Sequence, residues 1–129
     1  MDYGEKRIGV AVSDPLQMFA RPLKVLPGGQ EFFAEFANIL AEYTPQKIIL
    51  GMPYDLEGKK TKKCAEVEVF SSLLLSYFDL PVECYDEAFS SVDARKKLAR
   101  KGVSYSQIKG KLDMYAAAEI LGNYLERGK

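Results

Sequence analysis

The residues of this sequence best suited to catalysis are acidic, and they occur at three separated places. Asp2 lies just before a turn, the pair Asp86 and Glu87 follows an apolar segment, and Asp113 opens a stretch of helical periodicity. The chain has no histidine, which excludes Ser-His-Asp and Cys-His nucleophiles, His-Glu-x-x-His zinc proteases and imidazole general bases. Carboxylates must therefore carry any chemistry, and their oxygens favour hard cations such as Mg²⁺ and Mn²⁺.

Each acid taken alone has an ordinary structural interpretation. Asp2 could be a turn residue, Asp86 and Glu87 a polar strand end, and Asp113 an acid favoured by the positive end of a helix dipole. Their joint placement favours a metal site, because adjacent strands lie ~4.8 Å apart and acids at their ends can converge. Crowded carboxylates repel one another unless a cation lies between them. Such a cluster commonly binds one or two Mg²⁺ ions, which act on a phosphodiester displacement.

Hydrophobic periodicity predicts the elements that position these acids. We expect a first strand that ends at Asp2 and pairs back through a hairpin, and then four strands and four helices. The strands are expected at 7–13, 19–26, 47–51 and 80–87, and the helices at 31–43, 61–78, 90–101 and 112–125. This order predicts an α/β fold with a mixed five-stranded sheet, an antiparallel meander followed by alternating strands and helices, with helices on both faces. We expect a single domain over residues 1–129.

The charges of the chain cancel, with 18 basic and 18 acidic residues, but the basic residues are segregated. Between positions 95 and 111 there is no acid, and a second basic group lies at 59–63. A solvated helix face is the ordinary interpretation of such runs, yet phosphate contacts need only a local stripe of lysine and arginine. The candidate nucleic-acid contacts are therefore Lys59, Lys60, Arg95, Lys96, Lys109 and Lys111. Phe19, Tyr77 and Tyr105 are candidates for base stacking, although ordinary packing is favoured for each.

Cysteine content and hydropathy exclude several other classes of protein. Cys64 and Cys84 are the only cysteines, and without histidine two thiols do not build the usual zinc site. We expect both to be structural. No apolar run approaches the ~20 residues that cross a bilayer, and the charged opening is unlike a secretory signal. We therefore expect a cytoplasmic protein with no membrane partner.

Four segments of the chain resemble a known family. The stretch Asp2-Tyr3-Gly4-x-x-Arg7-Ile8-Gly9-Val10-Ala11-Val12-Ser13-Asp14 closely resembles the opening motif of the YqgF family, also called RuvX, whose members are ribonuclease H-like proteins. Further matches, in order along the chain, are Ile49-Leu50-Gly51-Met52-Pro53, Asp86-Glu87 with Ser90, Ser91 and Ala94, and Lys111-x-Asp113-x-x-Ala116-Ala117. Members are assigned to maturation of the 5′ end of 16S ribosomal RNA, or to resolution of Holliday junctions.

The resemblance implies a ribonuclease H-like nuclease with a two-metal site for Mg²⁺ or Mn²⁺. The metal ligands would be Asp2, Glu87 and Asp113, with Asp86 beside them as a further catalytic acid. The resemblance also implies structured RNA, or branched DNA, as the partner. Arg7 would lie at the mouth of the site, where it could steady a phosphate or form a structural salt bridge. Ser90 and Ser91 would cap the helix after Glu87 and orient it.

Two features depart from the family pattern. The family usually has arginine after the Asp-Glu pair, whereas this chain has Ala88, which cannot clamp a phosphate bidentately. Only Met1 precedes Asp2, whereas the family normally has several residues there: either the first strand is short, which would hold Asp2 loosely, or the chain as given lacks a few native residues.

Three other hypotheses remain open from the sequence. A nucleic-acid-binding module of the same fold with weak catalysis is suggested by Ala88 and the short opening. A phosphotransferase or ATPase of the actin and sugar-kinase type also places an Asp-x-Gly hairpin near phosphate and magnesium, but it uses two lobes. A junction resolvase would need two active sites and hence a dimer, whereas we see no apolar seam that demands one and expect a monomer or weak homodimer.

Overall fold

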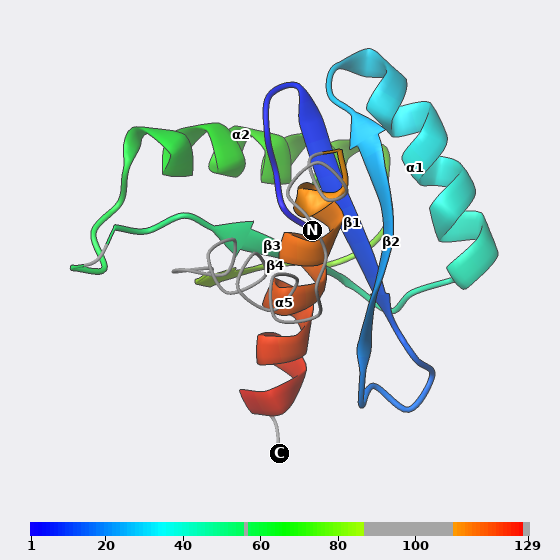
Figure 1. Ribbon diagram of the computed structural model, residues 1–129. Coiled ribbons are helices and arrows are strands. Elements are labelled where there is room, and N and C mark those ends of the chain that lie inside the picture. The colour runs from blue at the N-terminus through cyan, green and yellow to red at the C-terminus, as the bar shows by residue number, and fades with distance from the viewer. Residues whose placement is uncertain (56, 87–109, 128–129) are drawn as a thin grey trace.

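The computed structural model describes residues 1–55, 57–86 and 110–127. In chain order the elements are β1 (Arg7–Ser13), β2 (Ala20–Pro27), α1 (Gln30–Tyr43), β3 (Ile48–Met52), α2 (Lys62–Tyr77), β4 (Val82–Asp86) and α5 (Leu112–Arg127) (Figure 1). Each agrees with a predicted element to within two residues at either end. The helix predicted at 90–101, with its caps Ser90 and Ser91, lies outside the described residues.

The strands form two pairs, so the prediction of a five-stranded sheet is wrong. β1 pairs with β2 antiparallel, and β3 pairs with β4 parallel. The expected first strand is reduced to two residues that bond to both pairs. Asp2 exchanges two hydrogen bonds of 2.9 Å with Gly9 of β1. The Met1 ammonium donates to the Ile49 carbonyl (2.7 Å), and the Met1 carbonyl accepts from Gly51 N (3.0 Å). Two residues connect the pairs but are too few to form a ladder, since strands average about five or six residues.

Helices cover both faces of these strands, as the sequence predicted. Alternate strand residues face α1 and α2 and form one apolar core with them, made of Met1, Ile8, Val10, Leu26, Phe32, Phe36, Ile48, Leu50, Met52, Cys64, Val67, Phe70 and Leu74. On the other face α5 packs on β1 and β2 and buries Ala116, Ala117 and Ile120; Figure 1 shows it crossing in front of the strands. None of the helices in the described part of the chain is long and apolar enough to cross a membrane.

Cys64 has a structural role at the start of α2. Its side chain is fully buried, and its Sγ lies 3.4 Å from the Pro53 carbonyl oxygen. Thr61 caps the helix by accepting from Cys64 N, while Thr61 N donates to the sulfur at 3.2 Å. This reciprocal cap ties the loop after β3 to α2, in keeping with the structural role that the sequence predicted for this thiol.

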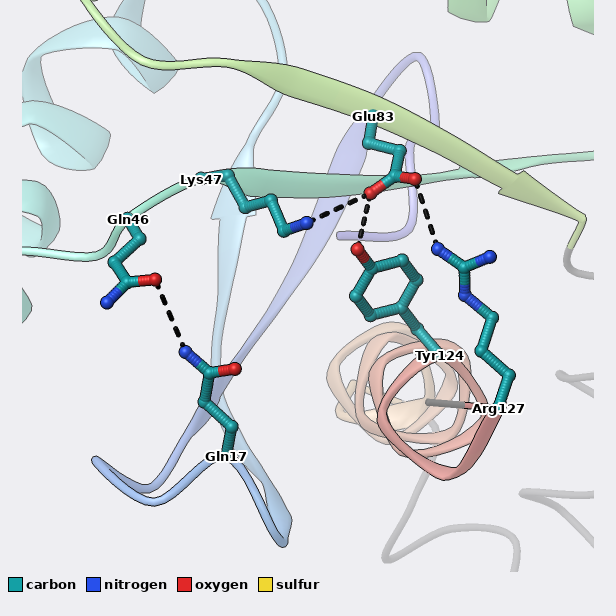
Figure 2. Close-up of polar contacts among 6 residues, drawn as sticks. All are labelled: Gln17, Gln46, Lys47, Glu83, Tyr124 and Arg127. Atoms are coloured by element: carbon teal, nitrogen blue, oxygen red, sulfur yellow. Dashed lines mark hydrogen bonds and ion pairs between the residues drawn. The ribbon is translucent and has the colours of Figure 1, made fainter. Parts of the chain in front are cut away.

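Met1 and Asp2 join the two strand pairs at one end. A cleft of about 860 Å³ lies between the pairs towards the other end. One wall is the second half of β1 and the other is the start of β3, with side chains of α1 and α5 completing the lining. Gln17 Nε2 donates to Gln46 Oε1 across it (3.4 Å; Figure 2). At this end the strand pairs are therefore connected through side chains, by the Gln17–Gln46 hydrogen bond and by the residues of α1 and α5 that line the cleft.

Candidate metal and nucleic-acid site

Asp2 is placed by the two hydrogen bonds that it exchanges with Gly9. The Met1 side chain is buried in the core beneath α1 and α2. Successive residues of an extended segment point to opposite faces, so Asp2 points to the face that α5 covers. A directly opposed antiparallel partner presents its side chain on the same face, and this partner is Gly9, which has none.

The start of α5 rests on Gly9. A Cβ atom added to Gly9 would lie 1.9 Å from the Asp113 carbonyl oxygen and 2.7 Å from Met114 N. Only glycine allows the helix backbone this close to the strand. Asp113 therefore contacts the same residue of β1 as Asp2, although it lies more than a hundred residues later in the chain. The sequence motif contained Gly9, but its role in joining these two acids is visible only in the structure.

Arg7 forms an ion pair with Asp113. Its Nε atom lies 3.3 Å from Asp113 Oδ2, and the two side chains are 61% and 29% exposed. Of the two roles expected for Arg7, the salt bridge is the one seen here, and the exposed guanidinium also remains accessible to a ligand. A positive charge is thus already accommodated beside this carboxylate.

Asp86 points away from Asp2 and Asp113. It is the last residue of β4, opposite Met52, and alternation places it on the same face as Val82, which packs against the core beneath α1 and α2. Within the described ranges, no three acidic or cysteine side chains gather closely enough to hold a metal ion. Glu87 and Ala88 lie outside the described residues.

The basic candidates that the structure describes are exposed and, in two cases, paired. Lys59 lies 3.4 Å from Glu57, and Lys60 lies 2.8 Å from Glu68. Lys111 is exposed directly before α5. Lys111 is therefore the described lysine nearest in sequence to the Asp113 end of the helix, while Arg95, Lys96 and Lys109 lie outside the described residues.

The aromatic candidates differ in their surroundings. Phe19 is 72% exposed in the loop before β2. Tyr77 stacks on Phe33 with a centroid separation of 4.1 Å, so its ring already has a packing partner. Tyr105 lies outside the described residues.

A polar cluster at Glu83 was not identified from the sequence. Glu83 accepts hydrogen bonds from the Tyr124 hydroxyl, from Lys47 Nζ at 3.3 Å and from Arg127 at 3.1 Å (Figure 2). The Tyr124 hydrogen bond, together with Lys47 and Arg127, holds the pKa of Glu83 below its usual value. An acid in the middle of a predicted strand was a signal, but its partners are Lys47, directly before β3, and two residues of α5, which are adjacent to it only after folding. We call Glu83, Lys47, Tyr124 and Arg127 the Glu83 cluster.

The Asp2 and Asp113 side chains fit a hard divalent cation better than any other cofactor. Both are carboxylates on the α5 face, which are the donors that Mg²⁺ and Mn²⁺ prefer. The ion pair with Arg7 shows that the surroundings of Asp113 favour positive charge. These two residues supply only part of a ligand set, and a further carboxylate is needed to complete it.

Comparison with known proteins relates the whole chain to one family. A family model described as RuvX, Holliday junction resolvase, matches residues 1–127. Relatives named "Putative pre-16S rRNA nuclease" include those of Chloroflexus aggregans (34% identical, covering 98% of this chain and 90% of the relative) and Desulforamulus reducens (36%, covering 99% and 95%). The solved structure of T. thermophilus RuvC in complex with a Holliday junction substrate has a similar fold, with a TM-score of 0.55 at 17% identity, covering 98% of this chain and 91% of that one.

Proposed function

Because the chain belongs to the RuvX family, we propose that it is a metal-dependent nuclease that hydrolyses phosphodiester bonds of structured nucleic acid. The observation that carries the proposal is the packing of the Asp113 backbone on Gly9. Asp2 is the residue directly opposite Gly9 in the antiparallel pairing. Backbone atoms of two acids from opposite ends of the chain thus contact the same glycine, and Asp113 is paired with an arginine that is accessible to solvent, which supports a shared role for the two acids. Residues 1–129 would act as one domain.

The metal ligands in this proposal are Asp2, Asp113 and Glu87. Asp86 lies on the α2 side of β4, away from the face that carries Asp2 and Asp113. This supports the choice of Glu87 over Asp86. When bound, Mg²⁺ or Mn²⁺ lowers the pKa of a coordinated water and offsets the charge of the phosphate.

Arg7 would bind a phosphate oxygen of the substrate. Its guanidinium is more than half exposed and lies at the edge of the acidic pair. A guanidinium can donate two parallel hydrogen bonds to a phosphate, which would orient the scissile group above the carboxylates. Lys111, exposed before α5, would add a second phosphate contact.

The substrate we propose is precursor 16S ribosomal RNA, in maturation of its 5′ end. The names of relatives that are 33–36% identical over nearly the whole chain support it. The description of the family model favours a second candidate, the Holliday junction. That reaction cuts two strands symmetrically and would require two copies of the chain.

The test is cleavage by the purified chain of a 5′-extended 16S RNA fragment and of a four-way DNA junction, each with and without Mn²⁺. We expect Mn²⁺-dependent cleavage of the RNA, lowered at least ~100-fold in Asp113→Asn, because loss even of outer-shell groups costs 10–100-fold. Asp79→Asn, which changes an exposed acid between α2 and β4, is the matched control and should cleave normally.

Three outcomes would contradict the proposal. Cleavage that persists in Asp113→Asn would show that the proposed metal site is not required for the reaction. Binding of both nucleic acids without cleavage would identify a binding module of the same fold. Cleavage of the junction alone would move the function to the second candidate.

A further inference from the structure

We propose that Glu83 is a positioning residue that fixes the orientation of α5, and with it Asp113, relative to the β3–β4 pair. The inference rests on the proposed function, since it concerns the geometry of that metal site. Glu83 itself lies on β4 and contacts Lys47, directly before β3, and two side chains of α5. It is therefore placed to act on the site through other residues and not by contact with substrate.

The need for such a residue follows from how the strand pairs are connected. Asp2 and Asp113 belong to the β1–β2 side of the molecule, through the contacts of both with Gly9. Asp86 ends β4, on the other strand pair. Beyond the two-residue bridge of Met1 and Asp2 the pairs are separated by the cleft. The orientation of α5 relative to β3 and β4 thus depends on what connects the helix to these strands.

The Glu83 cluster makes that connection at the C-terminal half of α5. One carboxylate oxygen accepts from Tyr124 and Lys47, and the other accepts from Arg127. Three donors from two elements converge on one acid, as Figure 2 shows. Hydrogen bonds from the charged donors Lys47 and Arg127 are stronger than those between neutral groups. Their directions define how far the end of α5 lies from β4 and how the helix is turned about its own axis.

Ring contacts reinforce the same connection. The Arg127 guanidinium lies 4.3 Å from the centroid of Tyr124 and 5.4 Å from that of Tyr85. The two tyrosine rings are perpendicular, with centroids 5.6 Å apart. Lys47 Nζ lies 5.1 Å above the Tyr124 ring. Tyr124 is thus contacted by Lys47 before β3, by residues of β4 and by Arg127 of its own helix, and the cation–π contacts add to the hydrogen bonds.

Rigid elements transmit this connection to the acids. Tyr124 lies eleven residues after Asp113 on the same helix, or about 16 Å along its axis. Glu83 lies three residues before Asp86 on the same strand, or about 10 Å away. A small rotation of α5 at Glu83 is therefore enough to displace Asp113 relative to the strands, and metal binding and phosphoryl chemistry are sensitive to displacements of ~1 Å.

The experiment measures the Mn²⁺ affinity of the folded chain by titration calorimetry, well below its melting temperature, for Glu83→Gln and Tyr124→Phe. We expect Glu83→Gln to weaken the Mn²⁺ Kd about threefold and to lower kcat on the RNA without raising KM, less than the ~10-fold typical of a group bonded directly to a ligand. Tyr124→Phe, which keeps the ring and loses one donor, should show a smaller change of the same kind. It also carries the test if Glu83→Gln does not fold.

Glu68→Gln is the matched control. Glu68 pairs with Lys60 at 2.8 Å and is exposed to a similar degree as Glu83, but it lies on α2, away from α5. It should leave Kd and kcat unchanged. If Glu83→Gln lowers only the melting temperature and leaves Kd and kcat unchanged, the residue is merely structural and the inference is overturned. If the wild-type chain does not bind Mn²⁺, or if Asp113→Asn does not weaken that binding, the proposed function itself fails and the inference fails with it.

Discussion

Helix α5 is attached to the strands by different physics at its two ends. At its start the backbone of Asp113 lies directly on Gly9, a steric contact that leaves no room for a side chain at this position of β1. At its end the attachment is a set of hydrogen bonds and ion pairs around a partly exposed carboxylate. The steric contact at Gly9 fixes how closely the helix approaches the strand and does not itself depend on pH or salt. The attachment at the end sets orientation and can be weakened by either.

The comparison predicts that the start of α5 tolerates substitution least. Gly9→Ala places a Cβ in contact with the Asp113 backbone, which cannot rotate away as a side chain can. We expect a loss of about 3 kcal/mol in the free energy of unfolding, at the upper end of overpacking costs, and loss of Mn²⁺ binding. Chemical denaturation followed by circular dichroism measures the first.

Gly122→Ala is the control on the same helix. Its added Cβ meets only the Ala20 side chain at 3.9 Å, an ordinary contact. It should stabilise the chain by about 0.5–1 kcal/mol, since alanine is the better helix former. Equal effects of the two substitutions would contradict the close approach at Gly9.

A second prediction separates the two roles of Arg7 at the start of α5. Arg7→Ala removes the ion pair with Asp113, so the carboxylate should bind Mn²⁺ about two- to fivefold more tightly, as expected for an exposed pair. If Arg7 also binds phosphate, KM for the RNA should rise about tenfold, and Arg7→Lys should fall between. Calorimetry and steady-state kinetics measure the two effects, and an unchanged KM would leave Arg7 with the salt bridge alone.

The third and smallest effect concerns the end of α5 and its dependence on pH. The pKa of Glu83 is lowered, chiefly by the Tyr124 hydrogen bond, so the folded state binds the proton less readily than the unfolded state. Its contribution to stability is present above the pKa of an ordinary glutamate and is lost as pH falls through the lowered pKa.

Thermal unfolding of the wild-type chain and Glu83→Gln across this acidic range tests the prediction. The melting temperatures should differ by a few degrees at neutral pH, as expected for exposed ion pairs. They should converge in acid and in high salt. A difference independent of pH would show that Glu83 does not act as a carboxylate.

Sequence patterns predicted most of the local structure correctly. The apolar run around Leu50 and the spaced phenylalanines of α1 gave strand and helix with bounds close to those observed, because periodicity reflects which side of an element is buried. The prediction failed at the first strand. The turn after Asp2 indicated its presence, but a strand forms only where enough residues bond to a neighbour, and among the described residues before that turn Met1 and Asp2 supply the bonds.

The candidate site divides in the same way. Carboxylates without histidine indicated hard-metal chemistry, and the family motifs selected Asp2, Glu87 and Asp113 from 18 acids. Motifs did not indicate that Asp86 points towards α2, because the face of a residue at a strand end depends on pairing register. They also passed over Glu83, whose partners are distant in sequence.

By itself the sequence determined the kind of chemistry available and the elements that carry it, because residue types and hydrophobic periodicity are local properties. Only the tertiary structure decided which acids share a face, what Arg7 contacts, and how α5 connects the two strand pairs. These are consequences of long-range packing. The close approach at Gly9 and the convergence on Glu83 each join segments that the chain separates by tens of residues, and no local pattern encodes such a meeting.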